Sequence, residues 1–312
     1  MSGSMTPEPV RSHGEQPPGP RAVGVIGLGI MGSLYARHLI EAGHEVAGFD
    51  VAEERCQEFT AAGGKLCASA AEVIERAGVV IVSLSSVAAF RRVMLGADAA
   101  SQRARPGQVV VETGTLPIAL KEEARRLLEQ RGAHLVDAPV TGTRFHAERK
   151  ELVVYASGSR AVIEQVRSVL EAFARDVRYV GEFGTGMKLK MVTNHLVAVH
   201  NVAAAEALSF AASAGLDLQQ VYDLIVGGPA SSAVFGFRGP LMVEGRYDPP
   251  TMRMDVFEKD LQIIDEFATA LHAATPLFQA SLGVYREALA QGMTHEDVAA
   301  TFEVLKGRSA GG

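Results

Sequence analysis

The segment VIGLGIMG at residues 25–32 constrains the fold of this chain more than any other. It places glycines in GxGxxG spacing, directly after an apolar run and at the start of an amphipathic pattern. Gly27 permits a tight turn, Gly29 lets the backbone approach a pyrophosphate, and Gly32 lets helix and strand pack closely. The free N–H groups of the helix start then face the anion. The predicted cofactor-binding turn consists of Gly27, Leu28, Gly29, Ile30, Met31 and Gly32.

Asp50 ends the next apolar run, about 20 residues after the glycines, where dinucleotide-binding folds place the carboxylate that accepts from the ribose hydroxyls. Because the chain has 32 glycines, a tight turn beside an ordinary surface aspartate is the plain alternative. The combination of strand, turn, helix and Asp50 favours dinucleotide binding. A carboxylate repels the 2′-phosphate of NADP, so NAD is the expected cofactor. Arg55 is the residue that leaves NADP possible.

Beyond Arg21, short β-branched runs alternate with helical patterns until about residue 180, and only helical patterns follow. This order predicts an α/β fold in which a Rossmann-type, doubly wound parallel sheet precedes an all-α C-terminal domain. Strands are expected at 22–26, 45–49, 78–83, 107–112, 133–136, 151–156 and 177–180. Helices are expected at 30–42, 53–62, 69–76, 117–131, 159–173 and 187–214. The predicted divisions are a disordered tail at 1–21, an NAD-binding domain at 22–182 and a helical domain at 183–308.

Composition narrows the function. The 312 residues carry a net charge of −6, which argues against nucleic acid as a partner. Two cysteines cannot form a disulfide framework, and a reducing compartment fits them best. The most apolar stretch, residues 195–216, contains polar side chains, so a buried helix is expected there and no membrane partner. We therefore expect a cytoplasmic protein.

Several separated motifs resemble the β-hydroxyacid dehydrogenase family, which includes 3-hydroxyisobutyrate dehydrogenase and tartronate semialdehyde reductase. The family's D-A-P-V-S-G-G segment corresponds to DAPVTGT at 137–143, and its G-x-G-x-x-x-K segment corresponds to GTGMKLK at 184–190, with Asn194 four residues further on. A K-D-L segment occurs at 259–261, and looser matches occur at 84–85 and 114–117. The resemblance covers roughly residues 22–308.

The resemblance implies hydride transfer between a nicotinamide and a 3-hydroxy acid or its semialdehyde, a small-molecule carboxylate bound between the two halves of the chain. It assigns catalysis to Lys190 and Asn194. It assigns the substrate carboxylate to Thr141, Gly142 and Thr143. It assigns contacts with the cofactor to Leu84, Ser85, Thr115 and Lys259.

The residues themselves support a proton-transfer role for Lys190. Lys190 and Asn194 are four apart on a predicted helix, so one substrate oxygen can meet both side chains. Burial beside a cofactor would lower the pKa of Lys190, so that it could act as general acid and base. The plain alternative is a pair of solvated lysines, Lys188 and Lys190, near a helix start. No metal is expected, because the histidines lack ligand spacing.

Departures from the family pattern leave the substrate open. Thr141 and Thr143 replace a serine and a glycine, and the charged run 144–150 replaces a glycine-rich stretch. Arg144 could meet a second anionic group on the substrate, although a charged run is usually a solvated loop. A reductase of a small aldehyde acid with such a group is therefore one alternative. Imine reductases and noncatalytic dinucleotide-binding scaffolds are others, and Lys190 argues against both.

Residues 195–213 are apolar on several faces of the predicted helix. Such a helix belongs in the middle of the second domain or at a contact between subunits. We therefore expect a homodimer or a homotetramer with closely packed helical domains.

Overall fold

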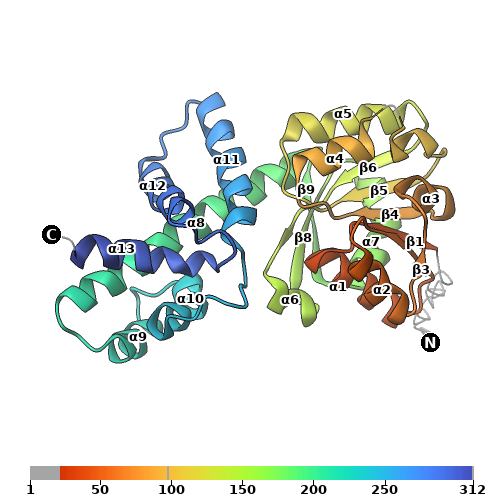
Figure 1. Ribbon diagram of the computed structural model, residues 1–312. Helices are drawn as coiled ribbons and strands as arrows, with labels where there is room; N and C mark the ends of the chain where they lie inside the picture. Colours follow the sequence, from red (N-terminus) through yellow and green to blue (C-terminus); the bar gives the residue numbers. More distant parts are fainter. Residues whose placement is uncertain (1–21, 97, 311–312) are drawn as a thin grey trace, which may run out of the picture.

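The structure, a computed structural model, describes residues 22–96 and 98–310 (Figure 1). A sheet flanked by helices occupies the N-terminal half, and helices alone form the C-terminal half. The fold class expected from the sequence is therefore confirmed. The predicted tail, residues 1–21, lies outside the described residues.

The sheet has the strand order β3-β2-β1-β4-β5-β6-β8-β7, with β9 paired to β8. Its strands are β1 Val23–Ile26, β2 Val46–Phe49, β3 Lys65–Leu66, β4 Val79–Val82, β5 Val109–Glu112, β6 His134–Asp137, β7 Val140–Thr141, β8 Leu152–Ser157 and β9 Ala174–Gly181. From β3 to β6 every pairing is parallel. The strand order reverses at β1, which is where open parallel sheets of this kind bind ligands.

Beyond β6 the sheet departs from the parallel arrangement expected from the sequence. β8 pairs antiparallel with both β6 and β7, whereas β9 pairs parallel with β8. The physical reason is connection length, because parallel neighbours need a crossover of a dozen or more residues. The connection between β7 and β8, residues 142–151, is too short for such a crossover, while α7 provides one between β8 and β9.

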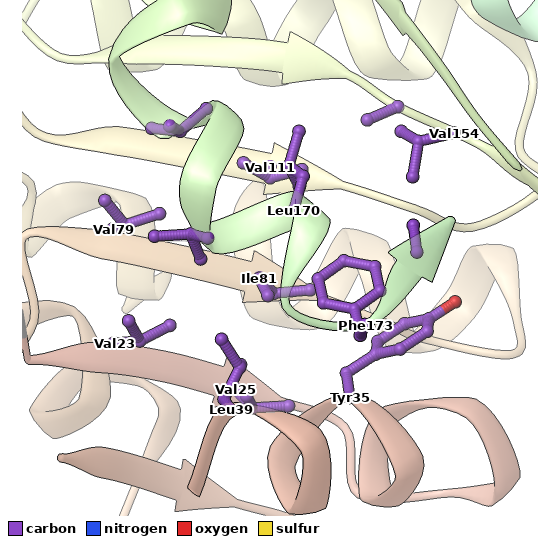
Figure 2. Packing of buried hydrophobic residues seen from close by; sticks show 14 of the residues in the cluster. Val23, Val25, Tyr35, Leu39, Val79, Ile81, Val111, Val154, Leu170 and Phe173 are labelled. Carbon is purple, nitrogen blue, oxygen red and sulfur yellow. The ribbon is translucent and has the colours of Figure 1, made fainter. Parts of the chain in front are cut away.

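Helices cover both faces of the sheet. They are α1 Ile30–Glu41, α2 Glu53–Ala61, α3 Ala70–Arg76, α4 Val87–Met94, α5 Ile118–Glu129, α6 Arg144–Glu148 and α7 Arg160–Glu171. Alternate strand residues such as Val25 and Ile81 face Tyr35 of α1 and Leu170 of α7 (Figure 2). The residues between them face α3, α4 and α5 on the other side of the sheet. Burial on both faces explains why the strands read as continuous apolar runs.

The C-terminal half is organised around one long helix, α8 Thr185–Ser213. The helices α9 Leu218–Val226, α10 Ala233–Glu244, α11 Met254–Ala270, α12 Pro276–Ala290 and α13 Thr301–Ala310 pack along it. Gly215, with φ +72°, follows its end, as the sequence predicts. Among the described residues α8 alone is long and apolar enough to span a membrane, with mean hydropathy 1.3, and 44% of that window is buried inside the protein.

Every strand and helix expected from the sequence is present, with ends shifted by a few residues. Not expected were the short elements β3, β7, α4 and α6 and the 3₁₀ helices Ala100–Arg103 and Val298–Ala300. The run at 144–150, expected to be a solvated loop, is mostly the short helix α6. Arg144 pairs with Glu148 along the helix at 2.7 Å, and Lys150 pairs with Glu41 of α1 at 3.6 Å.

Candidate active site

The glycine turn has the geometry that each glycine requires. Gly27 has φ +90°, and a Cβ there would lie 2.3 Å from the carbonyl oxygen of Ser83. A Cβ on Gly32 would lie 1.8 Å from the Gly27 oxygen, whereas a Cβ on Gly29 would meet no protein atom within 4 Å. Gly29 also begins α1 without a side-chain cap, and the first turn has no acidic residue. The turn therefore leaves open space and free N–H groups, which fit a pyrophosphate.

Asp50 lies beside this turn because β1 and β2 pair in register up to Ile26 and Phe49. Its carboxylate accepts hydrogen bonds from the backbone N–H groups of Leu28, at 2.6 Å, and Ala52, at 2.9 Å. These two bonds hold the half-buried carboxylate at the carboxyl end of the sheet. Arg55, the residue that left NADP possible, is paired with Glu58 at 2.7 Å.

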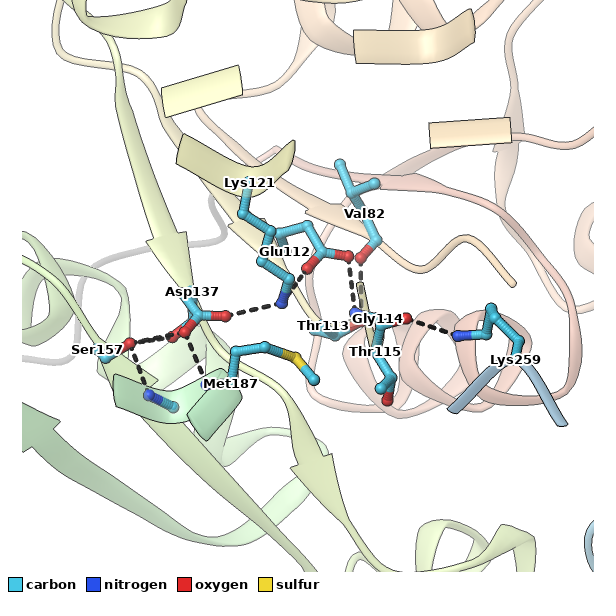
Figure 3. A network of polar contacts seen from close by, with 11 residues as sticks. Val82, Glu112, Thr113, Gly114, Thr115, Lys121, Asp137, Ser157, Met187 and Lys259 are labelled. Atoms are coloured by element: carbon cyan, nitrogen blue, oxygen red, sulfur yellow. Dashed lines mark hydrogen bonds and ion pairs between the residues drawn. The ribbon is translucent and has the colours of Figure 1, made fainter. Parts of the chain in front are cut away.

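Two further predicted cofactor segments follow the neighbouring strands β4 and β5, which pair in register up to Val82 and Glu112. Leu84 and Ser85 follow β4, and Thr115 follows β5. A Cβ on Gly114 would lie 3.1 Å from the Leu84 carbonyl oxygen, so the two loops lie side by side. The Thr115 carbonyl oxygen accepts a hydrogen bond from Lys259 of α11 at 2.6 Å (Figure 3). Lys259 thus links the helical half to the cofactor half.

Lys190 and Asn194 lie on α8, four residues apart. The Asn194 amide nitrogen donates to the Asp260 carboxylate at 2.9 Å, and the Lys259 ammonium lies 2.9 Å from the other oxygen of Asp260. Burial lowers the pKa of Lys190 below its usual value; the charge of Lys259 acts in the same direction, and that of Asp260 opposes it. The structure therefore brings Lys190, Asn194 and Lys259 together around Asp260, with Thr115 at the edge of the group.

The predicted substrate segment follows a different strand. Thr141 ends β7, Gly142 has φ +128°, and Thr143 precedes α6. The Thr143 backbone N–H donates to Nδ1 of His146 at 3.2 Å, and its hydroxyl lies 3.0 Å from the same nitrogen. β7 contacts α8, which places this segment next to the helix that carries Lys190 and Asn194. Arg144 is exposed and paired with Glu148.

Two charged residues in or beside the candidate site, Asp260 and Lys121, were not predicted from the sequence. The K-D-L motif does not by itself assign a role to Asp260, which interrupts the apolar stripe that includes Phe257, Leu261 and Ile264. Nor does any motif single out Lys121, which occupies a position in the stripe of Leu120, Ala124 and Leu128 on α5. In both helices a charged residue at an apolar position was the available signal.

No group of three His, Cys, Asp or Glu side chains suited to a metal ion occurs within residues 22–96 and 98–310. The expectation that the reaction needs no metal therefore stays a prediction.

A glycine turn at the carboxyl end of a parallel sheet, a carboxylate at the adjacent strand and a lysine of lowered pKa define a nicotinamide-dependent oxidoreductase. A family model described as the NAD binding domain of 6-phosphogluconate dehydrogenase matches residues 22–181. A second, described as NAD-binding of NADP-dependent 3-hydroxyisobutyrate dehydrogenase, matches residues 184–305.

The chain is 33% identical over 288 residues to an L-threonate dehydrogenase of Cupriavidus necator, covering 92% of this chain and 97% of that relative. A solved 3-hydroxyisobutyrate dehydrogenase from Salmonella typhimurium is 31% identical, with a TM-score of 0.84 and coverage of 91% and 99%. One from Mycobacterium tuberculosis is 27% identical, with a TM-score of 0.83 and coverage of 92% and 99%. The chain belongs to the β-hydroxyacid dehydrogenase family, and it is an NAD(P)-dependent oxidoreductase of hydroxy acids.

Proposed function

We propose that the chain transfers a hydride between NAD and a 3-hydroxy acid or its semialdehyde, with Lys190 as general acid and base. The observation that carries this proposal is the group formed by Lys190, Asn194, Asp260 and Lys259, joined to the cofactor half through Thr115. A proton-transfer residue with a lowered pKa beside a nicotinamide site is what carbinol oxidation requires. The noncatalytic scaffold and the imine reductase have no comparable use for this lysine.

The bound nicotinamide supplies the carbon that accepts or returns the hydride. In oxidation, the neutral Lys190 amine takes the hydroxyl proton as the substrate carbon loses its hydride. In reduction, the Lys190 ammonium returns that proton to the nascent alkoxide. Asp260 accepts one N–H of the Asn194 amide, which fixes the orientation of the amide and leaves its second N–H to donate to the substrate oxygen, while the proton of that oxygen passes to Lys190.

We further propose that Thr141, Gly142 and Thr143 hold the substrate carboxylate. Gly142 offers a backbone N–H in an open conformation, and the two threonines offer hydroxyls, a donor set suited to a small-molecule carboxylate. The contact between β7 and α8 supports a substrate that spans this segment and Lys190.

A screen of short 3-hydroxy acids, led by L-threonate, with NAD and NADH absorbance as the signal, tests the function. We include aldehyde acids with a phosphonate or sulfonate group, assayed in the direction of NADH oxidation, and a cyclic imine. Turnover of 3-hydroxy acids above the other classes supports the proposal. Preference for a doubly anionic aldehyde favours the alternative reductase, and binding of NADH without any turnover favours the noncatalytic scaffold.

We expect NADH to be preferred over NADPH, because the Asp50 carboxylate lies beside the glycine turn, where it would accept from the ribose hydroxyls and repel a 2′-phosphate. The pairing of Arg55 with Glu58 supports this preference, since Arg55 is already engaged. We expect kcat/KM to favour NADH by about tenfold or more, equivalent to roughly 1.4 kcal/mol. Paired steady-state assays measure this ratio.

Asp50→Ser should reduce that preference about tenfold, because it removes the charge and keeps a small acceptor for the Leu28 N–H. Glu54→Gln, at an exposed position of the following helix, is the matched control and should leave the ratio unchanged. A wild-type enzyme that is faster with NADPH would overturn the assignment of Asp50.

We propose a homodimer, or a homotetramer built from two dimers, that is joined through α8. Leu189, Val192, Leu196 and Phe210 are 38%, 63%, 44% and 76% exposed, and they follow one another at spacings close to multiples of the helical repeat. α9 supports the same interpretation, because its residues are mostly apolar and none is fully buried. A second copy that packs its own α8 against this face would cover these side chains.

Val192→Glu should shift the protein from dimer to monomer in size-exclusion chromatography with light scattering, because it places a charge in the middle of the proposed contact. Val51→Glu is the matched control: this valine is 79% exposed and lies in the cofactor half. A wild-type monomer at all concentrations, or a Val192→Glu variant that stays fully assembled, would contradict the proposal.

We also propose a domain boundary near residue 183 and a cytoplasmic location. The end of β9 at Gly181 and the start of α8 at Thr185 support the boundary, with residues 22–182 and 183–308 as the two domains. Cys56 and Cys67 are both free, which suits a reducing compartment.

A further inference from the structure

Lys121 is a fully buried cation between two fully buried carboxylates (Figure 3). Its Nζ lies 2.5 Å from the Glu112 carboxylate and 2.7 Å from the Asp137 carboxylate. Three buried charges are costly, because the desolvation of such groups often exceeds their mutual attraction. None of the three side chains belongs to the proposed chemistry.

Each carboxylate uses its other oxygen to hold one segment of the active site. Glu112 accepts from the Gly114 backbone N–H at 2.7 Å, next to Thr115, which accepts from Lys259. Asp137 accepts from the Met187 backbone N–H at 2.9 Å, three residues before Lys190. Lys121 therefore joins the loop on the cofactor side to the start of the catalytic helix.

The start of α8 is capped from the other half of the chain. Gly184 precedes the helix and has no side chain with which to cap it. The Gly186 N–H donates to the Ser157 hydroxyl at 3.0 Å, and the Met187 N–H donates to Asp137. These are the second and third helical N–H groups, which a capping side chain normally satisfies. The Ser157 hydroxyl in turn donates to Asp137 at 2.8 Å.

The contact leaves little room for adjustment. A Cβ on Gly186 would lie 2.3 Å from the Tyr155 carbonyl oxygen and 3.1 Å from Asp137. The first turn of α8 is thus held tightly against β8, and its N-terminus faces a carboxylate whose charge favours the helix dipole. Any shift of Asp137 would move the turn that carries Lys190.

We propose that Lys121 is a positioning residue: its ammonium holds the Asp137 carboxylate in place beneath α8, between Lys121 and the Met187 N–H, and thereby fixes Lys190 relative to the cofactor loop. This inference rests on the proposed role of Lys190. The charged and titratable groups around Lys121 are Glu112 on β5 and Asp137 on β6. Tyr35 on α1 lies near Glu112, and burial raises the pKa of its hydroxyl. Burial alone would lower the pKa of Lys121, but the two carboxylates together raise it, so the ammonium persists at working pH.

Lys121→Met tests the inference, because methionine fills the space without the charge. Without a cation, the two carboxylates share a proton at low pH and repel each other once both ionise. Capping of α8 in Lys121→Met should therefore weaken as pH rises and the second carboxylate ionises, whereas in the wild-type protein it should stay constant for as long as Lys121 remains an ammonium. We expect faster hydrogen exchange in the peptide 185–190, and an apparent Lys190 pKa, from competitive acetylation and mass spectrometry, that moves back toward the ordinary lysine value.

Lys121→Met with Glu112→Gln is the rescue variant. It leaves Asp137 as the single carboxylate, while the glutamine side chain that replaces Glu112 still offers an oxygen to the Gly114 N–H. Exchange at 185–190 and the Lys190 pKa should return to wild-type values at all pH. Leu128→Ala, which removes a buried side chain from the same helix, is the control for general destabilisation and should leave both readouts unchanged.

Three results would overturn the inference. In Lys121→Met, the loss of protection from exchange at 185–190 could be independent of pH or equal to that in Leu128→Ala. The double variant could also fail to restore wild-type exchange and the wild-type Lys190 pKa. If Lys121→Met does not fold, the variants Asp137→Asn and Glu112→Gln replace it. Asp137→Asn should increase hydrogen exchange at 185–190, and Glu112→Gln should not. Equal exchange in the two variants would count against a cap held by Asp137.

Neither readout needs turnover, so the two proposals can fail separately. If Lys190→Met has wild-type activity, the proposed role of Lys190 is wrong, but the effect of Lys121→Met on hydrogen exchange at 185–190 is still valid evidence for the cap. Where a substrate is in hand, the ratio of kcat of Lys121→Met to wild-type kcat at the same pH should fall by about tenfold or more as pH rises, in both directions of the reaction, while NADH affinity by fluorescence titration stays unchanged.

Discussion

Lys190→Met should lower kcat by about 10² to 10⁴-fold while the variant binds NADH with wild-type affinity. Methionine preserves the length of the side chain in this half-buried position but cannot carry a proton. In oxidation the hydroxyl proton would then have no acceptor as the hydride leaves, so positive charge would develop on a carbonyl oxygen that is still protonated. In reduction the nascent alkoxide would receive no proton. Single-turnover absorbance at the nicotinamide band measures the loss, and fluorescence titration measures NADH binding.

The pH dependence of kcat in the wild-type enzyme is an independent test of the role of Lys190. Burial lowers the pKa of Lys190, so the change between ammonium and amine occurs below the ordinary lysine range. Oxidation needs the amine, so its kcat should rise as pH increases through this pKa. Reduction needs the ammonium, so its kcat should fall over the same interval.

Lys188→Met is the matched control, because Lys188 is exposed on the same turn of α8. It should retain near wild-type kcat and both limbs of the pH profile. Similar losses in the two variants would mean that α8 needs positive charge in general, and a fully active Lys190→Met would remove the lysine from the mechanism.

The sequence predicts the cofactor half well because its signals are local. The turn at 27–32 and Asp50 lie within two successive strand and helix units, and parallel pairing necessarily brings the ends of β1 and β2 together. The segment 184–194 likewise carries Lys190 and Asn194 on one helix. Spacing along the chain was sufficient in both cases.

The rest of the site depends on contacts between distant segments. Asp260 is 66 residues from Asn194 and Met187 is 50 residues from Asp137, and no periodicity in the sequence links them. Lys121 looks like an ordinary charge on a helix until β5 and β6 place carboxylates on both sides of it. The antiparallel pairing of β8 was missed for a related reason, because a short run of apolar residues does not record strand direction.

The glycine turn allows cofactor binding and folding to be separated by two single substitutions. Gly29→Ala should weaken NADH binding by about a hundredfold, roughly 2.7 kcal/mol, with little change in Tm. Gly29 has φ −64°, which alanine adopts without strain, and the added Cβ would meet no protein atom within 4 Å. The methyl group would therefore affect only a pyrophosphate that approaches the turn.

Gly32→Ala should instead destabilise the protein itself, by about 3 kcal/mol, because a Cβ there would lie 1.8 Å from the Gly27 carbonyl oxygen. Backbone atoms cannot rotate away as a side chain does, so β1 and α1 must separate. The Tm should fall by several degrees even without cofactor, and NADH affinity should fall with it. Differential scanning fluorimetry with and without NADH distinguishes the two variants.

This pair decides whether the turn is a cofactor site or only a tight connection between β1 and α1. A turn with a purely structural role predicts that Gly32→Ala is harmful and Gly29→Ala is silent in every assay. A pyrophosphate site predicts that Gly29→Ala raises the Kd for NADH while the apo protein keeps its Tm. Since both variants add the same methyl group to the same turn, a difference in this direction can come only from a ligand that occupies the open side of Gly29.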